Sequence, residues 1–176
     1  LAGDGQGLLI VADRGGDLPE GGIAVAEVGV VRGPVPGVGE VAVEALVKVS
    51  ERAGVPVHIP LDVEGTCCGV PFSSKGFDEA HRHTINHAIE KFWEWSQEGR
   101  LAIVMDTSPC TYGVVTSRGY LTPENQARFD KLKIIDSTAF AHDVLLPKLQ
   151  VARKVGSVVL HPVCSLTKMN LVPKLE

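Results

Sequence analysis

Apolar residues recur in this chain with two spacings, which predict helices in some segments and buried strands in others. Segments 38–53 and 77–97 both carry an apolar stripe with the helical period. The stripe of the longer segment consists of Phe77, Ile85, Ala88, Ile89, Phe92 and Ser96. A glycine follows each segment, at Gly54 and Gly99, and glycine commonly follows the last helical residue. We therefore predict two amphipathic helices.

Short, continuous apolar runs predict buried strands in the same part of the chain. These runs lie at 55–59, 101–105, 132–135 and 155–160. A further helix is predicted after Thr122, with Thr122 as the cap and proline at the first helical position, and another over 137–149, with Ser137 as the cap. Strands and helices thus alternate. This order predicts an α/β domain with a largely parallel sheet flanked by helices.

The first 40 residues differ in composition from the rest. They hold more than half of the 19 glycines, and no aromatic residue precedes Phe72. Two apolar runs, 8–11 and 23–31, predict strands between glycine turns. We therefore divide the chain into a glycine-rich N-terminal segment, residues 1–40, and an α/β domain, residues 41–176. Because the chain begins with Leu1, we expect it to be a fragment of a longer protein.

Composition excludes several classes of function. The chain has 176 residues, of which 44% are hydrophobic and 22% charged, as in ordinary globular domains. A net charge of −4 without a basic run argues against a nucleic-acid partner. No apolar stretch approaches the ~18 residues of a membrane span. Four cysteines are too few for a disulfide framework in a chain of this length, so we expect a reducing cytoplasm and free thiols.

The cysteines stand where strands are predicted to end. Cys67 and Cys68 are adjacent and precede Gly69, and neighbouring thiols are poorly placed to bridge each other. Cys110 and Cys164 each follow a predicted strand after a polar residue and a proline turn. Parallel strands end at one edge of a sheet, where α/β proteins place their ligands. We therefore expect all four thiols on loops at the carboxyl edge of the sheet.

Soft sulfur donors on glycine- and proline-rich loops are typical of iron–sulfur sites. The backbone N–H of Gly69 suits a hydrogen bond to sulfur, and Lys75 and His161 are the nearest polar groups that would tune a reduction potential. Zinc is a second interpretation, although the usual Cys-x₂-Cys spacing is absent. Two others stay open. One is a structural or interaction domain with zinc or no metal, and the other is a thiol sensor with one cysteine of lowered pKa.

Three histidines lie on the predicted helix 77–97. His83 and His87 are one helical turn apart, but the intervening residues are not those of the His-Glu-x-x-His zinc hydrolase motif. Together with His81, they are expected to lie on a solvated helix face. We therefore predict no hydrolytic zinc site here.

Three short motifs, in order, carry a family resemblance. They read GTCCGVPFSSKGF at 65–77, DTSPCT at 106–111 and HPVCSLTK at 161–168. This series resembles the cysteine-rich CCG domain of FAD-linked D-lactate dehydrogenases of the cytochrome- or quinone-reducing type. Related modules occur in the iron–sulfur subunit of glycolate oxidase, in lactate-utilisation complexes and in heterodisulfide reductase. The resemblance covers about residues 42–176.

The resemblance implies an electron-transfer role within an oxidoreductase. A partner FAD-binding domain or subunit would oxidise a 2-hydroxy acid such as D-lactate, and iron–sulfur clusters would pass electrons to a quinone or cytochrome. Cys67, Cys68 and Cys110 match ligand positions of a first module, and Cys164 matches the opening cysteine of a second. The resemblance further implies a 4Fe-4S type cluster if fully liganded, and a cytoplasmic protein peripheral to the inner face of the membrane.

Three features of the family are missing from this sequence. They are a ligand cysteine upstream of Cys67, a second Cys-Cys-Gly motif, and the FAD domain. The chain by itself therefore contains no complete site for oxidising a substrate, and its first module has at most three cysteine ligands.

Overall fold

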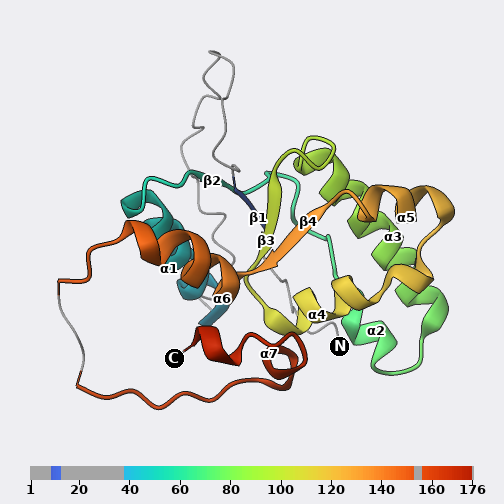
Figure 1. Ribbon diagram of the computed structural model, residues 1–176. Helices are drawn as coiled ribbons and strands as arrows, with labels where there is room; N and C mark the ends of the chain where they lie inside the picture. The colour runs from blue at the N-terminus through green and yellow to red at the C-terminus, as the bar shows by residue number, and fades with distance from the viewer. Residues whose placement is uncertain (1–8, 13–37, 153–155, 176) are drawn as a thin grey trace.

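A four-stranded sheet with helices on both faces forms the centre of the computed structural model, which describes residues 9–12, 38–152 and 156–175 (Figure 1). The strands are β1 (Leu9–Ala12), β2 (Val57–His58), β3 (Ala102–Met105) and β4 (Lys133–Asp136). Their order across the sheet is β2-β1-β3-β4. This mixture of helix and strand confirms the α/β class predicted from the sequence.

Strand direction is mixed within this sheet. β3 and β4 pair in parallel, with Met105 opposite Asp136, whereas β1 pairs antiparallel with both β2 and β3. It follows that β2, β3 and β4 point the same way and that β1 runs against them. The predicted parallel arrangement therefore holds for β2, β3 and β4. Of these, β2 and β3 lead into cysteine motifs, and β4 lies beside β3. An apolar run such as 8–11 predicts a strand, but its pattern carries no information on direction.

The helices vary in length. The described helices are α1 (Val38–Arg52), α2 (Val70–Ser73), α3 (Asp78–Trp95), α4 (Ser108–Thr116), α5 (Pro123–Phe129), α6 (Ser137–Phe140) and α7 (Cys164–Lys168), with short 3₁₀ turns at Arg118–Tyr120 and Val172–Lys174. As predicted, Thr122 caps α5, because its hydroxyl accepts a hydrogen bond from the Asn125 backbone N–H at 3.3 Å. No helix in the described ranges combines the length and apolar character needed to cross a bilayer.

β3 divides the core into two layers. Alternate residues of a strand face opposite sides of its sheet. Ile103 and Met105 accordingly pack in a cluster with the apolar face of α3, which includes Ile89. Val104 packs on the other side, in a cluster with Phe140 of α6. Because all four residues of β3 are buried, this strand fixes the positions of both helical layers.

The segment predicted as one helix over 137–149 is broken into three pieces. α6 ends at Phe140, a π-helical turn follows over Ala141–Leu145, and a 3₁₀ turn follows over Leu146–Lys148. The cap is Asp136, whose Oδ1 accepts from the Thr138 N–H at 2.9 Å. Ser137, the predicted cap, instead donates its hydroxyl to the carbonyl of Asp106 at 3.1 Å. The prediction of Ser137 as cap was therefore wrong by one residue.

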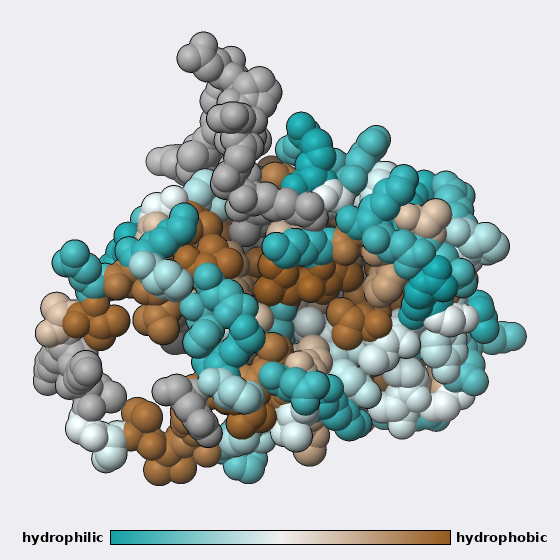
Figure 2. All heavy atoms as spheres, in the orientation of Figure 1, coloured by the Kyte–Doolittle hydropathy of each residue, from teal (hydrophilic) through white to brown (hydrophobic). Residues whose placement is uncertain are grey.

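The strand predicted at 155–160 is not formed. Residues 156–160 are irregular and belong to a wide loop that leads into α7 (Figure 1), and Val159 is 97% exposed. Apolar side chains lie along this loop in the space-filling view (Figure 2). β3 has a partner on each side, β1 and β4, and residues 156–160 pair with neither edge strand of the sheet, β2 or β4. Position 155 and the predicted strand 23–31 lie outside the described residues.

Candidate metal centre

The Cys-Cys-Gly motif forms a tight bend between β2 and α2. Gly69 has a φ of +79°, in the left-handed region that favours glycine. A Cβ atom added there would lie 2.6 Å from Nδ1 of His81, so the space as well as the conformation excludes a side chain. The glycine of the motif is therefore required by the backbone that carries the two thiols.

His81 packs against this bend and forms a hydrogen bond with it. Its side chain is only 2% exposed, and its Nδ1 donates to the carbonyl of Gly69 at 3.2 Å, because a carbonyl can only accept. Its Nε2 lies 3.1 Å from the hydroxyl of Ser117. His83 and His87 are exposed, as predicted, but the prediction of a solvated face was wrong for His81. The sequence did contain a signal, because His81 lies one helical turn before Ile85 on the apolar stripe.

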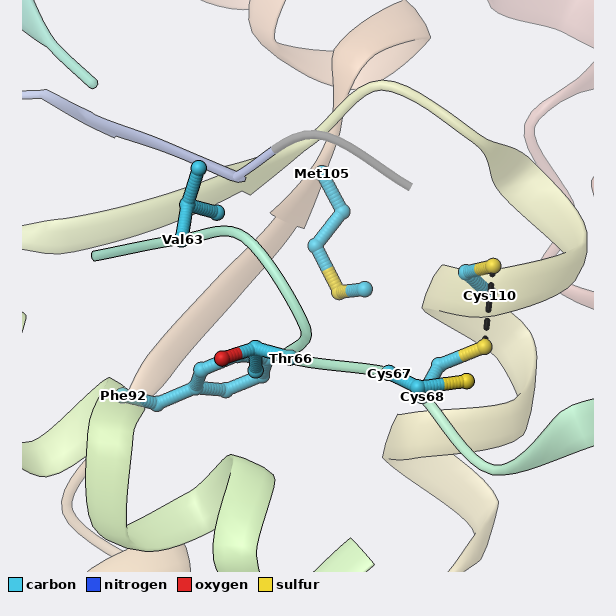
Figure 3. A pocket seen from close by; sticks show the side chains of 7 residues that line it. All are labelled: Val63, Thr66, Cys67, Cys68, Phe92, Met105 and Cys110. Atoms are coloured by element: carbon cyan, nitrogen blue, oxygen red, sulfur yellow. Dashed lines mark hydrogen bonds between the residues drawn. The ribbon is translucent and has the colours of Figure 1, made fainter. Parts of the chain in front are cut away.

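A loop and a helix from distant parts of the chain bring three thiols together, so the prediction that Cys110 lies on a loop was wrong. Cys67 and Cys68 lie in the loop after β2, and Cys110 lies in the first turn of α4, after β3. The sulfurs of Cys68 and Cys110 are 2.9 Å apart, and both side chains are buried, at 7% and 9% exposed. Cys67 is half-buried beside them, and its sulfur accepts from the Gly69 N–H at 3.4 Å (Figure 3). The predicted meeting of these three residues is observed.

The three thiols perturb one another's protonation. Hydrogen bonding with Cys110 is the main cause that raises the pKa of the Cys68 thiol, to about 11. The same contact lowers the pKa of Cys110, against the opposing effect of its burial. Hydrogen bonding with Cys68, together with burial, raises the pKa of Cys67. The thiol of lowered pKa that a redox sensor requires is therefore Cys110, and not either member of the Cys-Cys pair.

The thiols line a small cavity that also contains a residue missed by sequence reasoning. The cavity has a volume of about 10 Å³. Met105, the last residue of β3, lines it, and its thioether end extends toward the thiols (Figure 3). Met105 belongs to the apolar run 101–105, which predicts a buried strand. Its position at the carboxyl end of that strand is the signal in the sequence that places it near the cysteines. Three thiols and one thioether, all soft donors, thus line the cavity together with Val63, Thr66 and Phe92.

Cys164 lies apart from the other three cysteines. It is exposed at the start of α7, and it lines a separate pocket rather than the thiol cavity. Lys75 and His161, the predicted tuning groups, are exposed and do not line that cavity either. Residues 156–163 form no strand, so Cys164 does not follow the end of a strand as predicted.

The residues at this site fit a thiolate-bound centre in chemical type. Soft sulfurs, a backbone N–H directed at sulfur and a largely buried setting are the features that such centres share. The set of ligands, however, is smaller than an iron–sulfur cluster usually takes. Iron–sulfur clusters take about four cysteine ligands, and three are gathered here. Within the described ranges, no group of three or more His, Cys, Asp or Glu side chains is arranged to hold a metal ion.

Comparison with known proteins finds no family model that matches this chain, and no curated protein or solved structure with significant similarity to it. The resemblance to CCG domains therefore rests on the three sequence motifs alone.

Proposed function

We propose that this chain is an iron–sulfur electron-transfer module of the CCG type. In this proposal it relays electrons from a FAD-linked D-lactate (2-hydroxy acid) dehydrogenase domain or subunit to a quinone or cytochrome, on the cytoplasmic side of the membrane. The observation that carries the proposal is the gathering of Cys67, Cys68 and Cys110. Residues 42 positions apart place two sulfurs 2.9 Å from each other, in the same motifs that carry the resemblance.

Each element around the thiols has a part in this proposal. An iron–sulfur cluster at the site would supply one-electron redox chemistry. Cys67, Cys68 and Cys110 would hold it, and the Gly69 N–H would stabilise negative charge on sulfur. His81 holds the bend that presents Cys67 and Cys68. The burial of Cys68 and Cys110 limits water access, which influences the reduction potential.

Anaerobic reconstitution tests the proposal. The full chain is incubated with ferrous iron and sulfide, desalted, and analysed for bound iron and acid-labile sulfide and by electron paramagnetic resonance after reduction. We expect the wild-type chain to bind iron and sulfide, and the Cys68→Ser variant to lose most of both. Cys164→Ser is the matched control, because Cys164 lies outside the cavity. A wild-type chain that binds no iron, or equal binding in Cys68→Ser, would contradict the proposal.

A second candidate is a non-catalytic structural or interaction domain, with zinc or no metal. The volume of the thiol cavity favours it, because about 10 Å³ holds one water-sized particle. A zinc content near one per chain, with Cys67 and Cys110 protected from alkylation, would favour this candidate. If both cysteines are alkylated at the same rate with and without zinc, the metal-free version of this candidate is the one supported.

A further inference from the structure

A larger pocket lies between α2, α4 and α7, on a different side of α4 from the thiol cavity, and the two share no lining residue. Its volume is about 520 Å³, within the range of small-molecule sites, roughly 300–1,000 Å³. Among the residues that line it are Tyr112, Tyr120, Cys164, Ser165 and Lys168. The resemblance assigns Cys164 to a second module, but neither the resemblance nor the proposed electron transfer assigns an anionic ligand to this pocket.

Two hydrogen-bond donors in this pocket have no acceptor among the described residues. Ser165 is 7% exposed, yet its buried hydroxyl has no hydrogen-bond partner in the described part of the chain. The ammonium of Lys168 lies 5.0 Å from the centre of the Tyr112 ring, and it forms no ion pair with any described carboxylate. A buried hydroxyl without a partner costs free energy, so the Ser165 hydroxyl is available to an acceptor that the described residues do not supply.

Four other hydroxyls of the pocket already donate hydrogen bonds. Those of Ser73, Ser74, Thr116 and Ser117 each donate to a backbone carbonyl. Neither aspartate nor glutamate lines the pocket. What the described residues leave free is therefore one positive charge and neutral donors. The complementary ligand is an acceptor with a negative charge.

We propose that this pocket binds a small organic anion through its carboxylate or phosphate group. Lys168 pairs with the oxyanion, and Ser165 donates to it after rotation about χ1. The rings of Tyr112 and Tyr120, together with Val70, provide surface for the apolar body of the ligand. The chain carries a net charge of −4, so binding must come from this local arrangement and not from a general attraction of anions. The inference does not depend on the proposed electron transfer.

Titration of the full chain at low ionic strength, followed by backbone amide NMR, tests this proposal. The probes are inorganic phosphate, phenyl phosphate and benzoate. We expect saturable shifts in α4 and α7 with at least one of the two aromatic anions, and comparison of the two identifies the preferred oxyanion. Lys168→Met should weaken binding about tenfold or more, whereas Lys168→Arg should retain most of it.

Two further variants separate a binding role from a structural one. Ser165→Ala should weaken binding severalfold and leave the unfolding temperature of the free chain unchanged or higher, because the hydroxyl it removes has no partner. Lys148→Met removes an exposed lysine from another part of the surface and should leave affinity unchanged. Cys68→Ser should also bind normally, so a failure of the iron–sulfur proposal would not affect this result.

The outcomes that overturn the proposal are equally concrete. No saturable shift with any probe would refute it. Equal affinity of wild type and Lys168→Met would refute it, as would equal losses in Lys168→Met and Lys148→Met, which indicate unspecific charge effects. Binding of inorganic phosphate alone, with neither aromatic anion, would replace the organic ligand with a bare oxyanion and overturn the proposed class.

Discussion

Gly69 shows how one residue is fixed by two independent constraints. Its positive φ is readable from sequence, since glycine after two cysteines indicates a turn. Its contact with His81 is not, because that contact depends on how α3 packs beneath the bend. Sequence reasoning therefore placed Cys67 and Cys68 at a bend, as observed, but missed the histidine that supports it.

Replacement of Gly69 separates these two constraints. Gly69→Ala must adopt a strained φ and also displace the His81 ring, whereas Gly76→Ala meets a similar φ with open space around its Cβ. We expect Gly76→Ala to cost about 1 kcal/mol of unfolding free energy and Gly69→Ala about 2–4 kcal/mol. Urea denaturation followed by circular dichroism measures both. Equal losses in the two variants would mean that His81 does not pack against the bend.

At the scale of elements, the local sequence pattern was sufficient to predict a helix or strand where the tertiary packing agreed with it. The apolar stripe predicts α3, the capping residue predicts α5, and a short apolar run predicts the buried strand β3. The run at 155–160 has the same local character, but residues 156–160 pair with no strand. Strand propensity describes a segment, whereas strand pairing also depends on how the rest of the chain packs.

The loop at 156–160 gives a direct test of that difference. Val159→Asp should change the unfolding free energy by no more than about 0.5 kcal/mol, because the side chain is 97% exposed. Val104→Ala, in the buried strand β3, is the comparison and should cost about 2 kcal/mol or more. Chemical denaturation of both variants provides the measurement. A loss above 2 kcal/mol for Val159→Asp would place this segment in the core after all.

At the scale of the whole molecule, the rule that parallel strands end at one edge accounts for the thiol site. β2 and β3 point the same way, so the loops that follow them meet, although β1 lies between the strands. A surface clamp holds the first loop on α3, since Asp62 accepts from Lys91 at 2.7 Å and from the Trp95 indole at 2.8 Å. Cys164 could not be placed by this rule, because its strand is missing.

The same topology predicts how a bound centre would act on stability. A centre held by Cys68 and Cys110 would tie the loop after β2 to α4. A ligand that binds only the folded state stabilises the folded state, by about 2.7 kcal/mol when its free concentration is 100 times its Kd. We expect the anaerobically reconstituted chain to unfold at higher urea than the same chain after treatment with a chelator.

Two variants show whether this stabilisation comes from the thiol cavity. Cys68→Ser should unfold at the same urea concentration with and without reconstitution, since it removes a thiol that the two loops share. Cys164→Ser should keep the wild-type difference, because Cys164 lies on a pocket that shares no residue with the cavity. If both variants lost the difference equally, the stabilising centre would involve α7, and the three thiols gathered at the sheet edge would not be sufficient to hold it.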